Sequence, residues 1–440
     1  MSASILMTPV APALPIASTG AIAPRWALLG TILVVGVAFF LSEHDLHVSQ
    51  AVSYTQTAEE MEIAAGGGNS IRRLAFLVVA GWGLLLLATA RGKLRLDPLL
   101  ATTIGLVLAW AGISFLWADD SGMCLRRLMV LGCCVLAAAG IARRLSMSDL
   151  SWLAIGTMGT LAIVGILAEL SLGTFRPWAA DYRFAGTLHP NTQGPCLVAV
   201  ILAALGLARR NGVRGGFWLW GVVLVAFGLL LLTKSRTSAA AVFVAVGAVA
   251  IAQTSWRLKC VAGAGLLWLA GLGLLSLWLS GVDPLSDFRD ALLLGRAEES
   301  DTLSGRAFIW PEVLSFASQR PFFGYGYESF WTPERIETIS TALGWGLREA
   351  HNAYLEMLLS LGVVGLVLML SVVATGVLAA VRGYRDQRDP TYTLPLGMLV
   401  FGLLNAGLES GIVVVELVTF VLACCLLQMA LFRNPALCRT

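Results

Sequence analysis

Apolar runs long enough to cross a lipid bilayer recur along the chain, and they constrain its fold more than any other feature. A transmembrane helix needs about 20 mainly apolar residues, because each residue adds about 1.5 Å across a hydrocarbon core of about 30 Å. Lipid offers no partner to an unpaired backbone amide, so such segments are helical. The predicted spans are 26–42, 74–90, 98–117, 128–142, 150–172, 195–208, 217–233, 238–253, 260–282, 353–381, 394–408 and 411–432. The expected fold class is therefore an all-α integral membrane protein with about twelve transmembrane helices.

Composition and charge exclude most other classes of protein. Of the 440 residues, 57% are apolar and 13% are Asp, Glu, Lys or Arg, whereas soluble proteins carry about a quarter charged residues. A soluble multidomain enzyme, a disordered chain and a secreted disulfide scaffold are thereby excluded. The net charge of +3 gives no reason to expect a nucleic-acid partner. The eight cysteines lack the paired spacing of a zinc site, and we interpret them as core residues.

The distribution of basic residues predicts the orientation of the chain in the membrane. Twelve spans place both termini on one side. With the termini in the cytoplasm, short inner loops hold about twice as many Lys and Arg residues as short outer loops, as the positive-inside rule requires. The predicted organisation is a cytoplasmic tail (1–24), spans one to nine (25–282), a large periplasmic loop (283–352), spans ten to twelve (353–432) and a second cytoplasmic tail (433–440).

Some basic residues fall on the outer side against this rule, which suggests that they serve another purpose. They either pair with loops and lipid headgroups or converge on a polyanionic ligand. The outer basic residues of the short loops are Arg72, Arg73, Arg126, Arg127, Arg176, Arg183, Lys234 and Arg236. Ionisable residues within or beside spans are costly and face a cavity or each other. We expect Arg236 and Glu409 near a site, and Glu169 and Glu416 in structural pairs.

The loop 283–352 is the only polar stretch large enough to form a site. Apolar residues between Arg306 and Ser318 predict one face of a short helix that ends before Pro321. The sequence Gly-Tyr-Gly-Tyr at 324–327 then predicts a tight turn that presents aromatic rings. Such rings beside charged residues suit a carbohydrate surface, but an interfacial helix with an aromatic belt has the same composition.

His351 lies at the end of this loop, next to the outer end of span ten. A histidine at a membrane–water boundary can take up and release a proton near neutral pH, and Glu356 lies about one helical turn further in. His189 is the competing candidate, and a satisfied structural histidine is the simpler interpretation of either residue. The sequence contains no P-loop, HExxH or CxxC motif, so no metal or nucleotide cofactor is expected.

Several motifs together resemble the O-antigen ligase/polymerase family of bacterial inner-membrane glycosyltransferases. The resemblance covers roughly residues 105–425. It rests on SFLWADDSGMCLRRLMVLG, RFAGTLHPNTQGP, LLLTKSRTS, SGRAFIW followed by RPFFGYGYESFW, AHNAYLEMLLSLGVVGL and NAGLESG, in that order. GYGYESFW looks most like the exopolysaccharide-polymerase branch. His189-Pro190-Asn191 departs from the His-Lys-Asn of that branch and also occurs among ligase-like members.

The resemblance implies transfer of an oligosaccharide from undecaprenyl diphosphate to an acceptor sugar hydroxyl at the periplasmic face, with inversion and without metal or nucleotide. By matching position, His351 would be the general base, and Arg236 and Arg306 would bind the diphosphate. The residues that would orient the substrate are Asn191, Asn352 and Glu409.

The family resemblance also implies the partners and leaves the acceptor open. The expected partners are the lipid-linked donor, an acceptor glycan, the bilayer and a chain-length regulator. Polymerisation is favoured over ligation to lipid A–core or to a protein. A twelve-helix solute transporter is the alternative from another class, although secondary carriers usually show two similar halves.

Overall fold

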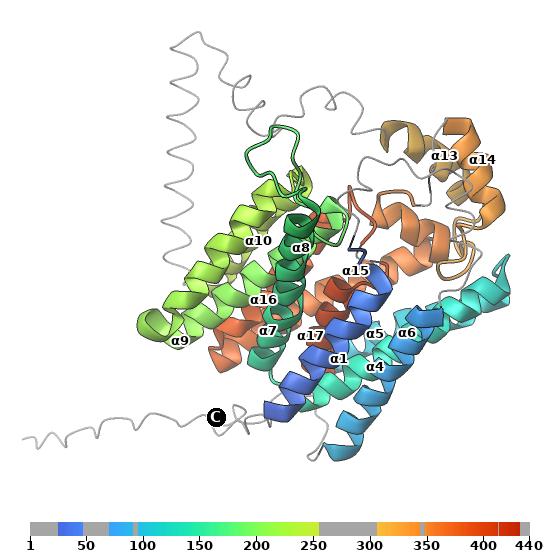
Figure 1. The fold of residues 1–440 in the computed structure, drawn as a ribbon. Coiled ribbons are helices and arrows are strands. Elements are labelled where there is room, and N and C mark those ends of the chain that lie inside the picture. The colour runs from blue at the N-terminus through green and yellow to red at the C-terminus, as the bar shows by residue number, and fades with distance from the viewer. Residues whose placement is uncertain are drawn as a thin grey trace, which may run out of the picture.

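The computed structural model describes residues 25–46, 70–90, 96–254, 306–343, 347, 349–411 and 413–431. All regular elements in these ranges are helices, as the all-α prediction requires (Figure 1). Nine helices in this part of the chain are long and apolar enough to cross a membrane. They are α1 (Arg25–Glu43), α4 (Ser70–Thr89), α5 with the turn that follows it (Pro98–Leu116), α6 (Ser121–Arg144), α7 to α8 (Met147–Leu172), the two halves of α9 (Pro190–Gly212 and Arg214–Leu232), α10 (Arg236–Gln253) and α15 (Ala353–Gln387).

The remaining predicted spans give two shorter helices and one segment outside the described residues. Segment 394–408 corresponds to α16 (Thr393–Asn405), and 411–432 corresponds to α17 (Leu417–Leu431). Both are shorter than a full span of about 20 residues. Segment 260–282 lies outside the described residues, so the total of twelve stays a prediction.

One helix begins well before its predicted start. The sequence predicted a short span at 128–142, whereas α6 begins at Ser121 because the Asp120 side chain caps it and accepts a hydrogen bond of 2.7 Å from the amide of Met123. Arg126 and Arg127 interrupt the apolar pattern in the first turns. Hydropathy therefore detected only the uninterrupted apolar part of α6.

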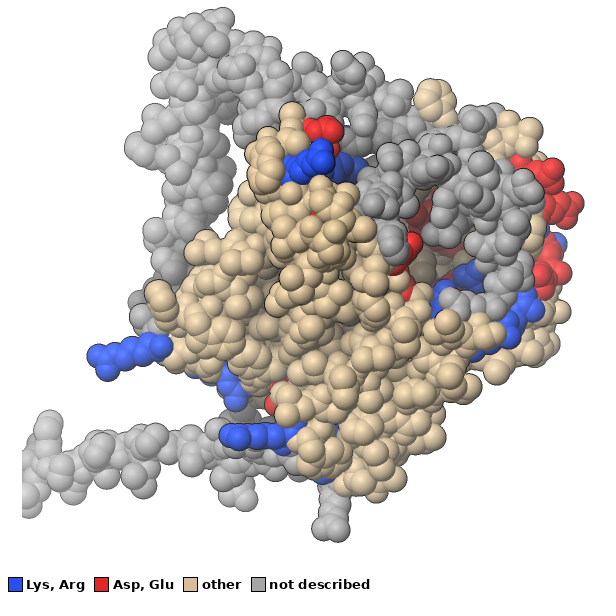
Figure 2. Space-filling model, in the orientation of Figure 1, with Lys and Arg blue, Asp and Glu red and all other residues tan. Residues whose placement is uncertain are grey.

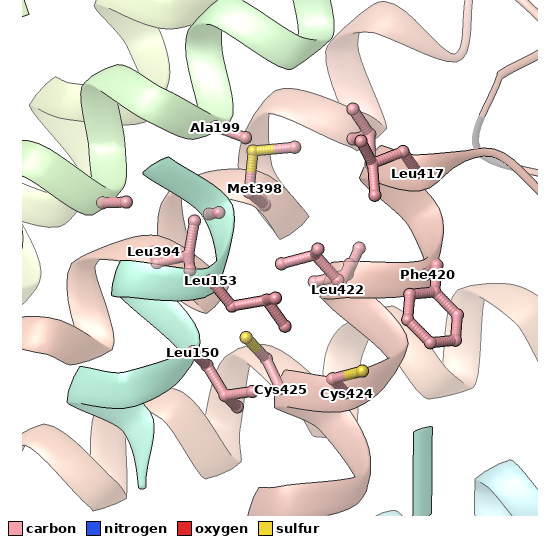
Figure 3. Close-up of a cluster of buried hydrophobic side chains, with 14 of the residues drawn as sticks. Leu150, Leu153, Ala199, Leu394, Met398, Leu417, Phe420, Leu422, Cys424 and Cys425 are labelled. Carbon is pink, nitrogen blue, oxygen red and sulfur yellow. The ribbon is translucent and has the colours of Figure 1, made fainter. Parts of the chain in front are cut away.

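The core lies where α17 meets α7, α9 and α16 (Figure 3). Side chains from all four helices are buried there, among them Leu153 of α7, Met398 of α16 and Phe420 of α17. Cys424 and Cys425 are free thiols with no exposed surface. The interpretation of the cysteines as small core residues is confirmed for this pair.

Short connections rich in arginine meet at one end of the bundle. Arg210 pairs with Asp389 at 2.9 Å, and Arg382 approaches Asp97 at 3.8 Å. Figure 2 shows basic side chains along this lower end of the molecule, away from α13 and α14. The connections that meet here are ones that the positive-inside rule assigns to the cytoplasm.

At the opposite end lie α13 (Arg306–Gln319) and α14 (Pro333–Leu343), which belong to the predicted outer loop (Figure 1). The short helix predicted between Arg306 and Ser318 is thus confirmed. Its apolar face consists of Ile309, Val313 and Ala317, which are buried in a cluster with residues of the following turn and of α15.

Helix α15 is broken at Gly362, and the turn after α13 fills the break. Gly362 has φ 66°, so the carbonyls before it lose their partners within the helix. The amide of Tyr325 donates to the Leu359 carbonyl at 2.7 Å and that of Gly326 to the Ser360 carbonyl at 2.9 Å. Non-helical backbone at membrane depth is tolerated only where protein supplies such partners. The outer loop is therefore fastened to a membrane helix by main-chain hydrogen bonds.

Gly362→Ala is expected to destabilise the protein by at least about 2 kcal/mol, because a Cβ adds left-handed strain and overpacking. That Cβ would lie 2.2 Å from the Phe322 carbonyl carbon. Gly228→Ala in α9 is the matched control, since no atom lies within 4 Å of its Cβ position. The midpoint of thermal denaturation in detergent should fall for the first variant and hold or rise for the second. Equal midpoints would show that the break needs no glycine.

Candidate active site

His351 sits on a tight turn immediately before α15, in an unusual backbone conformation. Its φ is 49°, in the left-handed region that non-glycine residues rarely adopt. Asn352 begins the helix beside it: its Oδ1 accepts hydrogen bonds from the amides of Tyr354 and Leu355 at 3.0 and 3.1 Å. Its Nδ2 donates to the Gly407 carbonyl at 3.1 Å. Asn352 therefore ties the His351 turn to the segment that follows α16.

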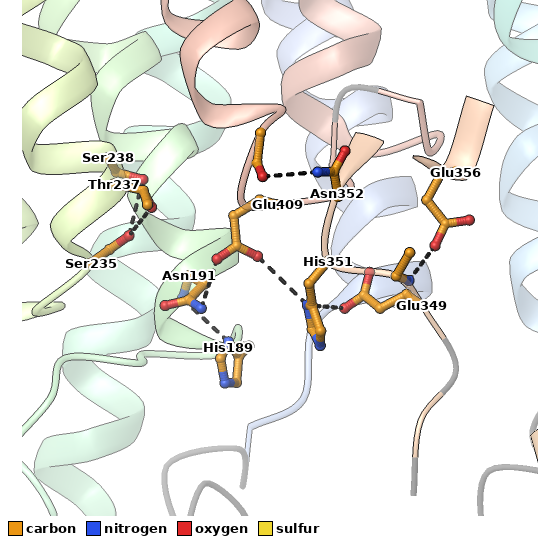
Figure 4. A network of polar contacts seen from close by, with 12 residues as sticks. His189, Asn191, Ser235, Thr237, Ser238, Glu349, His351, Asn352, Glu356 and Glu409 are labelled. Carbon is orange, nitrogen blue, oxygen red and sulfur yellow. Dashed lines mark hydrogen bonds and ion pairs between the residues drawn. The ribbon is translucent and has the colours of Figure 1, made fainter. Parts of the chain in front are cut away.

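Two carboxylates flank the imidazole of His351 (Figure 4). Its Nδ1 lies 3.2 Å from Oε1 of Glu349 and 3.9 Å from Oε2 of Glu409. The Glu409 side chain is 13% exposed and that of His351 33% exposed, so the pair lies at the edge of the protein interior. Nearby carboxylates stabilise the positive charge that an imidazole acquires when it takes a proton.

Glu409 also connects His351 to the start of α9. The Nδ2 of Asn191 donates to Oε1 of Glu409 at 2.9 Å. The Oδ1 of Asn191 accepts from Nη2 of Arg183 at 2.9 Å, and Nε of Arg183 donates to the Thr233 carbonyl at 3.1 Å. A continuous polar chain thus joins the α8–α9 connection, α9, the segment after α16 and the His351 turn.

Three of the residues singled out from the sequence are brought together here, namely Asn191, His351 and Glu409. Arg183 was expected only as one of several outer basic residues. It is also the first residue of the motif RFAGTLHPNTQGP, which does not include Arg176, and this position is the signal that could have singled it out.

That connection is folded around Glu169, which has no exposed surface. Its carboxylate accepts hydrogen bonds from the Tyr182 hydroxyl and from the amides of Ala185 and Gly186, at 3.0 and 2.7 Å. Glu169 is therefore partnered by the backbone around Arg183. Glu416, predicted to lie within span twelve, instead directly precedes the first residue of α17.

Arg236 is the first residue of α10, at the same end of the bundle as Asn191. The first turns of α9 and α10 pack closely, since a Cβ on Gly194 would lie 2.7 Å from Oγ of Ser238 (Figure 4). Arg306 is the first residue of α13, but its side chain lies outside the described part of the chain. Convergence of the two arginines on His351 stays a prediction.

At this outer end the space-filling view shows acidic and basic side chains on one face (Figure 2). Such a surface offers both proton acceptors and donors for an anion.

The aromatic motif after α13 packs mainly inward. Tyr325 is 3% exposed and Trp331 9% exposed, because both rings pack into the cluster formed with α13 and α15. In the same stretch, the rings of Phe322 and Phe323 are exposed, and the Phe323 ring lies 5.5 Å from that of Trp110 in α5. Of the two interpretations that the sequence left open, this burial does not favour an open carbohydrate surface at Tyr325 and Trp331.

Comparison with known proteins links the chain to enzymes of surface glycans. Residues 220–370 match a family model described as O-antigen ligase. The exopolysaccharide production protein ExoQ of Rhizobium meliloti is 26% identical over 274 residues, which are 58% of this chain and 59% of the relative. An O-antigen ligase of Pseudomonas aeruginosa is 34% identical over 108 residues, 24% of each chain.

A general O-oligosaccharyltransferase of Acinetobacter baylyi is 26% identical over 197 residues, 43% of this chain and 33% of the relative. The matches therefore span about three fifths or less of the relatives' own lengths. The segment matched by the family model includes Arg236, Arg306 and His351, whereas Asn191 and Glu409 lie outside it.

Proposed function

We propose that the chain is a membrane glycosyltransferase of the O-antigen ligase family that acts in polysaccharide biosynthesis. It transfers an oligosaccharide from undecaprenyl diphosphate to an acceptor sugar hydroxyl, at the periplasmic face of the bacterial inner membrane. The observation that carries this proposal is the placement of the His351 imidazole beside Glu349 and Glu409. This imidazole is half-exposed and flanked by negative charge, as a general base should be.

His351 removes the proton of the acceptor hydroxyl as its oxygen attacks the anomeric carbon. The bond from that carbon to the diphosphate oxygen breaks on the opposite face, so the configuration inverts. A positioned base of this kind typically contributes about 10²–10⁴-fold to the rate. Glu349 and Glu409 stabilise the imidazolium that forms.

The departing lipid diphosphate gains negative charge in the transition state, and Arg236 and Arg306 are assigned to bind it. The planar guanidinium group donates two parallel hydrogen bonds to phosphate oxygens. One well-placed donor contributes about 3 kcal/mol to such a transition state. The donor is already activated as a diphosphate ester, so the reaction needs no nucleotide.

Polymerisation is the favoured reaction. Its support is the match to the exopolysaccharide production protein, which is the longest of the three alignments. In a polymerase the acceptor is a second lipid-linked repeat, and a chain-length regulator is an expected partner. In a ligase the acceptor is the lipid A–core oligosaccharide or a protein.

Reconstitution tests the proposal directly. Purified protein in proteoliposomes receives a lipid-linked oligosaccharide together with either a second lipid-linked repeat or lipid A–core, and products are separated by size. Longer lipid-linked glycan supports a polymerase, and glycosylated lipid A–core supports a ligase. Uptake of a solute into sealed vesicles without any glycan transfer would favour the transporter and overturn the enzyme assignment.

Glu409→Gln should lower turnover about tenfold, equivalent to about 1.4 kcal/mol, because it removes a negative charge 3.9 Å from the imidazole that stabilises the imidazolium. The amide keeps the shape of the side chain but loses the charge that faces His351. Glu337→Gln on the exposed face of α14 is the matched control and should be active. Wild-type turnover of Glu409→Gln in the proteoliposome assay would remove Glu409 from the mechanism.

A further inference from the structure

The carboxylate of Glu356 is buried directly beneath the His351 turn. Its side chain lies in the first turn of α15 and the residue is 8% exposed. A buried carboxylate is costly unless its oxygens accept hydrogen bonds. Its oxygens accept from Nε1 of Trp331 at 3.1 and 3.0 Å and from the amide of Ala350. Both donors come from segments outside α15.

Ala350, the residue before His351, has both of its backbone polar groups held. Its amide donates to Glu356, and its carbonyl accepts a hydrogen bond of 3.2 Å from Nε1 of Trp310 in α13. Two tryptophans of the outer loop therefore restrain the backbone of Ala350. Trp310 bonds to it directly, and Trp331 acts through Glu356. Ala350 itself has no exposed surface.

The turn needs such restraint because His351 has φ 49°. A non-glycine residue pays about 1–2 kcal/mol for this conformation, so it persists only when the surroundings fix it. After His351 in the chain, the amide of Ala353 donates to the carbonyls of Ala406 and Glu409 at 2.8 and 3.2 Å. Before His351, the hydrogen bonds of Ala350 supply the restraint.

We propose that Glu356 is a positioning residue for His351, and that Trp310 and Trp331 complete a clamp on Ala350 which fixes the imidazole between Glu349 and Glu409. This inference rests on the proposed function of His351 as general base. The proposal assigns buried Trp331, from the aromatic motif of the outer loop, an indirect role in catalysis. Through this clamp, Trp310 of α13 restrains the backbone that carries the imidazole.

Trp331→Phe and Glu356→Gln test the clamp. The first removes the indole donor and keeps an aromatic ring, and the second keeps one carbonyl acceptor for Ala350. Each should lower kcat about tenfold and leave the KM for the lipid-linked donor within twofold of wild type. Glu356→Ala should lose more than Glu356→Gln. The double variant should lose less than the product of the single effects, because both belong to one network.

Tyr325→Phe is the matched control. It lies in the same motif and loses the hydrogen bond of 2.9 Å from its hydroxyl to the Phe316 carbonyl, which does not reach Ala350. It should retain wild-type kcat. Size-exclusion profiles and thermal midpoints show whether each variant is folded. If Glu356→Ala does not fold, the same fall in kcat is measured for Trp331→Phe and Trp310→Phe instead.

Hydrogen exchange supplies a readout that does not depend on activity. The peptide covering residues 347–353 should exchange faster in Glu356→Gln and Trp331→Phe than in wild type or Tyr325→Phe. Unchanged exchange would show that the clamp does not hold the turn, and faster exchange at wild-type kcat would show that the restraint does not serve catalysis. Either result overturns the inference. Wild-type turnover of His351→Ala in the same assay would instead refute the proposed function.

Discussion

Replacement of His351 by alanine is expected to abolish glycan transfer while the protein still inserts in the membrane. The Nδ1 of the His351 imidazole lies 3.2 Å from Glu349 and 3.9 Å from Glu409. Loss of a positioned base typically costs about 10²–10⁴-fold in rate. The loss should appear in kcat, because the imidazole acts on the acceptor proton and does not hold the lipid diphosphate. Single-turnover transfer in proteoliposomes, with equal amounts of folded protein, measures it.

His189 provides the control for this prediction because it was the competing candidate. It is exposed, and its Nδ1 accepts a hydrogen bond of 3.3 Å from the amide of Asn191, so it caps α9. Asparagine is a preferred residue at that position. His189→Asn should therefore fold normally and keep turnover within a few-fold of wild type. A reversed pattern, in which His351→Ala is active and His189→Asn is not, would transfer the role of base to His189.

The membrane helices were predictable because lipid imposes a simple requirement of length and apolarity. Hydropathy located the apolar parts of the helices better than their ends. Arg126 and Arg127 lie in the early turns of α6, so hydropathy missed the part that begins at Ser121. The same physics cannot show that α15 breaks at Gly362, since the break depends on the turn Pro321–Gly326 reaching it from elsewhere in the chain.

The residues of the candidate site were named from the sequence, but their contacts were not. His351, Asn191 and Glu409 were expected to act on substrate, which stays a prediction; in the structure Asn191 donates to Glu409, whose carboxylate lies 3.9 Å from the His351 imidazole. Arg183 enters that chain only because Glu169 folds the α8–α9 connection around itself. These partners are far apart in sequence, and no local pattern encodes them.

The buried position of Trp331 shows a further limit of composition. Aromatic residues beside charged ones suited either a carbohydrate surface or an aromatic belt, yet the indole of Trp331 donates to a buried carboxylate. Tryptophan carries a large apolar ring and one polar donor, and both are satisfied in the interior when an acceptor is present. The acceptor, Glu356, was noted as lying near His351, but its partners could not be deduced from spacing.

Arg236→Lys is the second substitution expected to have a large effect, even though it preserves charge. Arg236 stands at the N-terminus of α10, where a cation opposes the helix dipole. The Ser235 side chain makes no capping hydrogen bond there, so the helix amides and the guanidinium are both suited to an anion. A lysine cannot reproduce the two parallel hydrogen bonds of a guanidinium to a diphosphate.

Turnover of Arg236→Lys should therefore fall about 10²–10³-fold, the usual cost of losing one donor to a transition-state anion. Arg210→Lys is the matched control, because Arg210 pairs with Asp389 at the opposite end of the bundle. It should leave turnover unchanged and fold equally well. Binding of undecaprenyl diphosphate alone, measured by thermal stabilisation, should weaken for Arg236→Lys and not for Arg210→Lys. If both variants bind the diphosphate and transfer glycan like wild type, Arg236 serves only the packing of α10, and the anion must be held elsewhere.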